Sequence, residues 1–261
     1  MTEMPPLTNH SVKDRIRDYW SFRAATFDND PGHAIEPVRE APLWQALITR
    51  TLGPVKGKQV LDLASGTGEI SRQLLDLGAD VTGVDFSEEM MHRAREKHAG
   101  RRWQGVLDDA EILASQPDAH FDAIMTRHLV WTLPDPDGAF RTWYRVLKPG
   151  GRILLVDGDW RSNGFPRNML RALADWLEPG KDRPNARADY GDIMDHVKYG
   201  KGVDAMLLAD DLAAAGFTGI RTYSLRDIYW RGMGHAPWPR RLRLMASRKF
   251  AMVAQRPLTK Q

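Results

Sequence analysis

A short apolar run that leads through small residues directly into a helical pattern constrains the fold of this chain most. The run is VLDLASGTGE, at residues 60–69. Small residues in such a turn let the backbone approach a ligand closely, and the helix that follows offers free N–H groups. Asp85 ends the next apolar run, 23 residues after Asp62, where a carboxylate can accept hydrogen bonds from both hydroxyls of a ribose. The segment therefore predicts a site for a ligand that contains a nucleoside.

Short apolar runs alternate with helical patterns from residue 57 onward. We predict strands at 60–64, 81–85, 103–107, 121–126 and 152–157, helices at 70–77, from 87 and at about 137–147, and closing strands at 218–225 and 246–255. Alternation at this rhythm is typical of a parallel sheet with right-handed crossovers. The predicted fold class is α/β, with a Rossmann-like, doubly wound, mostly parallel seven-stranded sheet.

Four segments make up one compact unit in this interpretation. Residues 1–55 form an N-terminal helical lid, 56–160 the Rossmann-like core, 161–209 an inserted cap that contacts substrate, and 210–261 a C-terminal helix with the closing strands. In the lid, Ser11 is expected to cap the first helix. Pro37 is expected near the start of the second helix, which Gly53 ends.

The cap contains apolar residues that either wall a pocket or form a small core of their own. These are Met169, Leu170, Trp176, Leu177, Tyr190, Met194 and Tyr199. After the cap, Asp210 and Asp211 are expected to precede a short helix, and residues 230–243 to form a basic loop with Trp and Pro.

Composition excludes several classes of protein. The chain has 261 residues and no Cys, which excludes disulfides, thiolate zinc sites and cysteine nucleophiles. Its net charge of +3 is too balanced to indicate a nucleic-acid binder. We expect no secretory signal and no membrane span, since no stretch approaches the ~20 apolar residues that a span requires. The prediction is a soluble, cytoplasmic protein that binds neither DNA nor membranes, with a homodimer as one option.

A dinucleotide such as NAD is the first alternative ligand. Its fingerprint requires glycine at position 71, which is Ser71 here. It also does not usually place an acid at Asp62, inside the first strand, because a carboxylate there would repel phosphates. A ligand that carries a positive amino group suits Asp62 better.

Further motifs follow in a fixed order along residues 56–160. After Asp62 and Asp85 come Asp109-Ala110-Glu111 behind the third predicted strand, Leu133-Pro134-Asp135-Pro136 behind the fourth, and LKPGGRILLVD at 147–157. This order resembles the core of the class I S-adenosylmethionine (SAM)-dependent methyltransferases, in particular the small-molecule, UbiE-like group. The resemblance implies SAM as the cofactor and S-adenosylhomocysteine as its product.

The resemblance also implies roles at the methionine end of the cofactor. Asp62 would face the amino group, and Tyr19 in the lid would either present its ring to the sulfonium or only pack in its helix. Ala64 stands where the family usually has its first glycine, but it is small enough for binding to survive. The remaining residues implied at this end are Ser65, Gly66 and Gly68 of the turn under the ligand and the backbone of Thr126 and Arg127.

At the nucleoside end, Asp85 would hold the ribose, with Phe86 stacking beside the adenine. Asp109 would accept a hydrogen bond from the adenine amino group, with the adjacent Asp108 as the alternative contact. Ala110 and Glu111 would line the ring.

Candidate catalytic residues lie in the lid and behind the fourth and fifth predicted strands. His128 and His33 are candidate general bases, because an imidazole titrates near neutral pH. Asp157 could orient a substrate amine or hydroxyl, or only cap its loop. No metal is expected.

The predicted function is methyl transfer from SAM to a small-molecule acceptor by in-line displacement in a lidded pocket, with an O, N, S or C acceptor left open. The loop at 126–131 lacks the Asn/Asp-Pro-Pro-aromatic motif of adenine and cytosine-N4 enzymes. Two alternatives stay open: an RNA methyltransferase, and a non-catalytic SAM-binding regulatory or scaffold protein.

Overall fold

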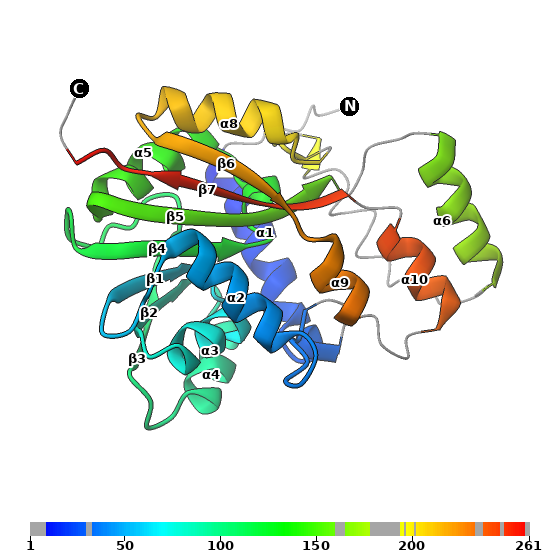
Figure 1. Cartoon of the computed structure of the whole chain (residues 1–261), viewed down its shortest axis with the longest axis horizontal. Helices are drawn as coiled ribbons and strands as arrows, with labels where there is room; N and C mark the ends of the chain where they lie inside the picture. Colours follow the sequence, from blue (N-terminus) through cyan, green and yellow to red (C-terminus); the bar gives the residue numbers. More distant parts are fainter. Residues whose placement is uncertain are drawn as a thin grey trace, which may run out of the picture.

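A computed structural model of the chain describes residues 9–29, 33–159, 165–177, 194–195, 197–200, 202–232, 237–245 and 248–258. Its seven strands form one sheet in the order β3-β2-β1-β4-β5-β7-β6 (Figure 1). The strands are β1 Gln59–Leu63, β2 Asp80–Asp85, β3 Trp103–Leu107, β4 Phe121–Arg127, β5 Leu147–Asp159, β6 Thr218–Ser224 and β7 Arg248–Gln255. Strands β1 to β5 are parallel, and β7 runs antiparallel to both β5 and β6. The predicted mostly parallel, Rossmann-like sheet is thus confirmed.

The order of the strands fixes where a ligand can bind. The chain proceeds from β1 outward to β2 and β3, then returns to β4 on the other side of β1. Ligands of such sheets bind outside the carboxyl ends of the strands, where the order reverses. That point lies between β1 and β4.

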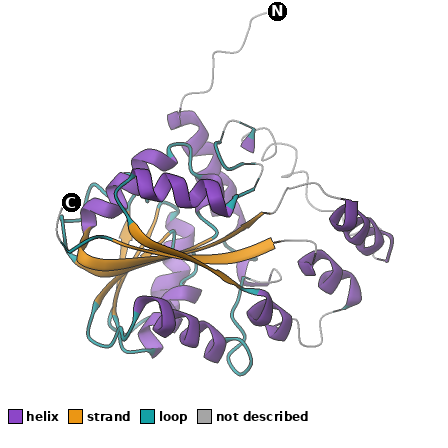
Figure 2. Cartoon of the chain, turned by 45° about the horizontal axis from the view of Figure 1, so that its top comes forward, coloured by secondary structure: helices purple, strands orange, loops and turns teal. Residues whose placement is uncertain are grey.

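Helices lie on both faces of the sheet (Figure 2). They are α1 Asn9–Arg23, α2 Ala41–Leu52, α3 Glu69–Asp76, α4 Glu88–Lys97, α5 Pro136–Val146, α6 Phe165–Leu177, α8 Ala205–Ala214, α9 Arg226–Gly232 and α10 Trp238–Met245, with short 3-10 helices η1 Phe27–Asn29 and η2 Val130–Thr132. No helix in the part of the chain described here is long and apolar enough to cross a membrane.

Alternation along the strands separates two apolar cores. On one face, Trp44 of α2 packs with Val60 and Met125 of the sheet. On the other face, Trp143 of α5 packs with Leu61. Both tryptophans are almost fully buried, so each contributes roughly 1.5–3 kcal/mol or more of hydrophobic stabilisation.

Side-chain caps decide where two helices begin. The hydroxyl of Ser87 accepts the backbone N–H of Met90 at 3.2 Å and starts α4. The carboxylate of Asp204 accepts the N–H groups of Met206 and Leu207 and starts α8. Such caps are each worth about 0.5–2 kcal/mol.

Three local predictions from the sequence differ from the structure. Helix α8 begins at residue 205, so Asp210 and Asp211 lie inside it, and the helix spans the predicted boundary at 209/210. Residues 226–232 and 238–245 are helical, not a basic loop. Helix α2 begins four residues after Pro37. The side chain of Ser11 and the whole of Tyr190 lie outside the described residues.

The apolar residues of the predicted cap separate into three groups. Met169, Trp176 and Leu177 are exposed on α6, which lies beside α10, apart from the sheet (Figures 1 and 2). Tyr199 belongs to the core under α5 and donates a hydrogen bond to Asp211. Met194 packs with Val12 and Ile16 of α1 and with Val197, so the cap and the N-terminal helix meet.

Candidate functional site

The glycine-rich turn after β1 is held by its own backbone and by Asp85. The N–H of Ser65 donates to the carbonyl of Val84 at 2.9 Å, and the N–H of Gly68 donates to that of Ser65 at 2.8 Å. Gly66 and Gly68 adopt φ values of +54° and +83°, which glycine tolerates without steric cost. A Cβ at position 68 would lie 2.3 Å from Nε2 of His98, so only glycine fits there.

Ala64 occupies a left-handed backbone conformation, with φ of +50°. This conformation costs a residue with a Cβ about 1–2 kcal/mol. The cost explains why a glycine suits the position and why an alanine is the smallest departure from it. The methyl group of Ala64 contributes to the walls of both cavities described below.

Asp62 lies in β1 on the face covered by α3 and is 1% exposed. Its Oδ2 accepts a hydrogen bond from the hydroxyl of Ser71 at 2.7 Å, and Ser71 accepts one from Nε1 of Trp103 at 3.0 Å. Burial raises the pKa of Asp62 to about 7, because a desolvated carboxylate disfavours its charge. Ser71, the residue that speaks against a dinucleotide fingerprint, therefore orients Asp62.

Asp85 ends β2, and its two carboxylate oxygens accept two backbone N–H groups. Oδ2 accepts from Gly66 at 2.8 Å and Oδ1 from Ser87 at 2.9 Å. Burial raises the pKa of Asp85 to about 6, against the opposing effect of these hydrogen bonds. The residue is 6% exposed.

The first cavity, of about 380 Å³, lies at the carboxyl ends of β2 and β3 and under α1. Its walls include the predicted nucleoside-end residues Asp85, Phe86, Asp109, Ala110 and Glu111, joined by Lys13, Ile16, Ala64, Leu129, Thr132, Leu133 and Pro134. Asp108 is not among them, because its carboxylate accepts both the backbone N–H and the hydroxyl of Ser115. Of the two adjacent acids, Asp109 faces the cavity.

Lys13 of α1 bridges the two acids that follow β3. Its Nζ lies 2.7 Å from Oδ2 of Asp109 and also contacts Oε2 of Glu111. Glu111 accepts the N–H of Asp135 at 2.8 Å through its other oxygen. Burial lowers the pKa of Lys13 but the two carboxylates outweigh it and leave the pKa raised. Burial raises the pKa of Glu111.

The second cavity, of about 350 Å³, lies on the other side of the glycine-rich turn. It is lined by Phe27, Asp62, Ala64, Ser65, Gly66, Thr67, Glu69, Ile70, Arg127 and His128. The hydroxyl of Ser65 lies 3.8 Å from Sδ of Met91. Ala64 is shared by both cavities, so an elongated ligand could extend across it.

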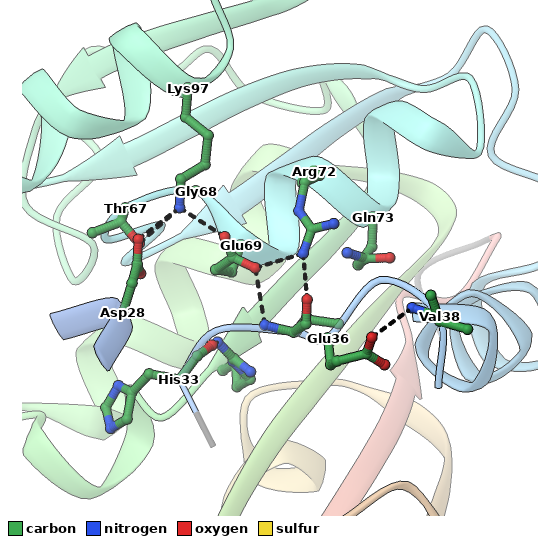
Figure 3. A network of polar contacts seen from close by, with 12 residues as sticks. Asp28, His33, Glu36, Val38, Thr67, Gly68, Glu69, Arg72, Gln73 and Lys97 are labelled. Atoms are coloured by element: carbon green, nitrogen blue, oxygen red, sulfur yellow. Dashed lines mark hydrogen bonds and ion pairs between the residues drawn. The ribbon is translucent and has the colours of Figure 1, made fainter. Parts of the chain in front are cut away.

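A polar network ties the segment at 27–36 to the glycine-rich turn (Figure 3). Nζ of Lys97 lies 2.9 Å from Asp28 and 2.7 Å from Glu69, and the hydroxyl of Thr67 donates to Asp28 at 2.5 Å. Glu69 also accepts the N–H of Ile35 at 3.0 Å.

Arg72 completes this network. It donates to Glu69 at 2.8 Å and to the carbonyl of Ile35 at 2.6 Å. Hydrogen bonds with Arg72 and Lys97 outweigh burial and lower the pKa of Glu69 to about 2. Glu69 therefore remains charged at neutral pH and holds the segment that carries Phe27 and His33.

The two candidate bases lie near one another behind this segment. The ring centroids of His33 and His128 are 6.0 Å apart, and a guanidinium nitrogen of Arg127 donates to the carbonyl of His33. Burial, followed by the charges of Arg127 and Lys249, lowers the pKa of His33 to about 3 and that of His128 well below its ordinary value. Both imidazoles are thus neutral at physiological pH.

Asp157 lies in β5 and is fully buried. Its oxygens accept the N–H of Gly158 at 2.8 Å and that of Trp131 at 3.4 Å. It is not a lining residue of either cavity. Across the described ranges, no group of three His, Asp or Glu side chains is arranged to hold a metal ion.

Three other predicted residues line neither cavity. The hydroxyl of Thr126 donates to the carbonyl of Leu63 at 2.8 Å and ties β4 to β1. Gly68 starts α3, and its carbonyl lies 2.9 Å from Nε2 of His98. Tyr19 packs edge-on against Trp20, with centroids 5.1 Å apart, beside the apolar cluster of α1.

Sequence reasoning missed Lys13, Glu69 and Lys97. Glu69 carries a signal that could have been found, because it is the first residue of α3, directly after the turn. The pairing of Lys13 with Asp109, 96 residues away, has no local signal.

Comparison with known proteins places the chain in a family. A profile described as "Methyltransferase domain" matches residues 61–155. A demethylmenaquinone methyltransferase of Clavibacter sepedonicus is 40% identical over 116 residues, which cover 44% of this chain and 47% of that protein. That of Mycolicibacterium paratuberculosis is 30% identical over 187 residues, or 70% of this chain and 77% of that protein. The chain thus spans about half the length of the first relative and about three quarters of the second.

A solved structure has the same fold over nearly the whole chain. Phosphoethanolamine N-methyltransferase 2 of Haemonchus contortus, in complex with phosphomonomethylethanolamine and S-adenosylhomocysteine, is similar with a TM-score of 0.65 and 18% identity. The similarity covers 97% of this chain and 61% of that one. Together with the matched profile and the two relatives, this shows that the chain belongs to the class I SAM-dependent methyltransferase family.

Proposed function

We propose that this protein binds SAM across the two cavities and transfers its methyl group to a small-molecule acceptor. The observation that carries the proposal is the arrangement of three acids at the carboxyl ends of three neighbouring strands. Asp62, Asp85 and Asp109 belong to β1, β2 and the loop after β3, and the two cavities that they line share Ala64.

The residues of the first cavity suit a nucleoside. The carboxylate of Asp85 accepts one backbone N–H at each oxygen, and each oxygen keeps a lone pair for a ribose hydroxyl. Phe86 offers an aromatic wall, and Asp109 an acceptor for an exocyclic amine. Lys13 and Ile16 extend the cavity under α1, which supports the proposal that residues 1–55 act as a lid.

The residues of the second cavity suit an amino acid. Asp62 would face the ammonium group, and ionised Asp62 is stabilised when that cation is present. Arg127 lines the same cavity, and its backbone would close the methionine end, as the family resemblance implies. At Gly66 the left-handed backbone, with φ of +54°, favours glycine; a Cβ there would make only ordinary contact with Phe27, at 3.7 Å.

When bound, SAM would supply an electrophilic methyl group on its sulfonium. A lone pair of the acceptor would form the new bond to the methyl carbon as the S–CH₃ bond breaks, and the electrons of that bond would remain on the sulfur of the leaving S-adenosylhomocysteine. The chain's own task is to align the two reactants and exclude water. The network around Glu69 holds Phe27 and His33 over the glycine-rich turn. Burial and nearby cations lower the pKa of His33 and of His128, so both are neutral but weak proton acceptors. Either imidazole would act as a general base only if the bound reactants raise its pKa towards neutrality. Asp157 would support this region through Trp131.

Relatives guide the choice of acceptor. Both relatives are named for demethylmenaquinone methylation, which makes a reduced naphthoquinone the first acceptor to test. Their names also favour a small molecule over RNA.

Calorimetric titration with S-adenosylhomocysteine, with NAD as the control, tests the cofactor. We expect binding of the former only. Transfer of radiolabelled methyl from SAM to a reduced naphthoquinone then tests catalysis, with a panel of phenols, amines and thiols as further acceptors. Binding of S-adenosylhomocysteine without transfer to any acceptor would favour a regulatory SAM-binding protein. Binding of neither S-adenosylhomocysteine nor NAD would contradict the proposal.

A further inference from the structure

A group of hydrogen-bond donors meets at the carboxyl end of the sheet, and one of its members, Arg127, lines the second cavity. Arg127 ends β4, and Lys249 in β7 pairs with Gly158 in β5. By the two-residue alternation of strands, these three positions share the face on which Met125, Val156 and Ala251 pack against α2 and α9. Gly158 carries no side chain, so Arg127 and Lys249 are the polar side chains of this row.

One aromatic ring lies beside each of the two cations. Nζ of Lys249 lies 3.5 Å from the ring centroid of Tyr229 in α9, and the guanidinium of Arg127 lies 5.6 Å from the ring of Trp44 in α2. The two rings are themselves 6.2 Å apart. The rings exclude water from the two cations, and the face of each ring attracts the neighbouring positive charge.

Two buried polar atoms in this group have no hydrogen-bond partner within the described part of the chain. They are the hydroxyl of Tyr229 and Nδ1 of His33. An unsatisfied buried polar group is costly, so two such atoms next to Arg127 and Lys249 point to a ligand atom that satisfies them.

The charges that face Lys249 come from several elements. Burial, followed by the charge of Arg127, lowers the pKa of Lys249 to about 7, while Glu40 before α2 opposes this shift. Burial raises the pKa of Glu40 itself. His33 and His128 are neutral. The charge of Asp157 in β5 helps to raise the pKa of Tyr229. An anion bound here would favour protonated Lys249 and relieve its repulsion from Arg127.

We propose that this group is the acceptor subsite, and that it takes an acceptor with an anionic oxygen, a carboxylate or a phenolate, between Lys249, Arg127 and the hydroxyl of Tyr229. The inference rests on the proposed function, since the subsite adjoins the cavity assigned to the methionine end. Arg127 and His128 line that cavity, so an oxygen held by this group would lie near the methyl donor.

The test uses the protein saturated with S-adenosylhomocysteine and two small probes, benzoate and its neutral analogue benzamide. Binding of S-adenosylhomocysteine is measured first, so that a failure of the proposed function is recognised separately. At pH 7 we expect benzoate to bind at least about tenfold more tightly than benzamide, since a hydrogen bond to a charged group is worth about 1.5–3 kcal/mol. Phenol and 4-nitrophenol, which differ in acidity, test the phenolate in the same way.

Variants of two residues test which side chains cause the preference for benzoate over benzamide. Lys249→Met should remove most of this preference, and Tyr229→Phe, which keeps the ring, should weaken benzoate binding about threefold to tenfold. Lys148→Met is the matched control, because Lys148 pairs with Asp122 at the opposite end of β5. Circular dichroism and the measured affinity for S-adenosylhomocysteine check that each variant is folded.

The pH dependence separates Lys249 from Arg127. Benzoate affinity should fall by about tenfold or more between pH 6.5 and 8.5 as Lys249 loses its proton. Lys249→Arg should keep the preference for benzoate but bind it equally well across this range, since a guanidinium does not deprotonate. Equal affinity for benzoate and benzamide, or a preference that Lys249→Met leaves intact, would overturn the assignment while the proposed SAM site stands.

Discussion

Oδ2 of Asp85 accepts the backbone N–H of Gly66 at 2.8 Å. One carboxylate at the end of β2 thereby fixes the glycine-rich turn that follows β1, and through Ser87 it also fixes the start of α4. Asp85 shapes the site before any ligand enters it. The residue proposed to bind the ribose is therefore also part of the fold.

Replacement of Asp85 by Ala should lower both affinity and stability. Two buried N–H groups lose their acceptor, which costs about 2–4 kcal/mol in the free energy of unfolding, and the melting temperature should fall by about 5 °C or more. Affinity for S-adenosylhomocysteine should fall at least about tenfold. Thermal unfolding and calorimetry measure the two effects. Asp76→Ala, in a surface ion pair with Arg101, is the control, and an unchanged affinity in Asp85→Ala would refute the placement of the ribose.

Affinity for S-adenosylhomocysteine should rise with pH between about 6 and 8. Asp62 has a pKa of about 7, and only its ionised form attracts an ammonium group, so binding should release protons below this pH. Titration in buffers of different ionisation enthalpy measures the released protons. Asp62→Asn should lose the part of the pH dependence that belongs to this residue; a wild-type affinity that is flat with pH would contradict the assignment.

The stability of the ligand-free protein should change with pH in the opposite direction. The folded-state pKa values of Asp62 and Asp85 lie above the ordinary carboxyl value, so the folded chain binds more protons than the unfolded chain. The stability that these groups contribute is fully present below pH ~4 and is lost as the pH rises towards 7. Denaturant unfolding of wild type and Asp62→Asn at several pH values checks the sign. The difference between the two proteins should change steadily across this window, and a constant difference would count against the raised pKa of Asp62.

Ala64→Gly should stabilise the protein. Removal of the Cβ relieves the left-handed conformation and adds about 1–2 kcal/mol to the free energy of unfolding. The greater freedom of glycine in the unfolded chain lowers that free energy by about 0.5–1 kcal/mol. The melting temperature should rise by about 1–4 °C, and Ala64→Val should lower it. Ala123→Gly, at a buried position in β4, should destabilise; if Ala64→Gly behaves in the same way, the backbone of Ala64 is not strained.

Lys13→Met should loosen α1 over the first cavity. Glu111 is 6% exposed and would lose its cation, which costs about 1–2 kcal/mol for a partly buried pair. Hydrogen exchange should quicken in residues 9–23 while the sheet stays protected. Arg17→Met removes an exposed pair with Asp14 on the same helix and should change exchange little. Equal exchange in Lys13→Met and wild type would show that the ion pair does not hold the helix.

The strands, the turn and the acids could be predicted from the sequence because each is a local pattern. Short apolar runs define β1 and β2, and a chain that passes from β1 through Gly66 and Gly68 into α3 has few backbone options. Because parallel strands share one carboxyl edge, Asp62, Asp85 and Asp109 had to approach one another once the fold was known. Helix N-caps were harder to predict, since Asp210-Asp211 matches the pattern of a helix start whereas the carboxylate of Asp204 caps α8.

Which charged groups meet could not be predicted from the sequence, because it depends on how distant elements pack. Lys13 reaches Asp109, Glu69 joins Lys97 and Ile35, and Lys249 lies over Tyr229, all between elements whose separation in the chain carries no periodic signal. The charge state of each group depends on burial and on such partners, which is why His33 and His128 look like ordinary histidines in the sequence and are neutral in the fold. Local sequence fixes the backbone of the site, and long-range packing fixes its electrostatics.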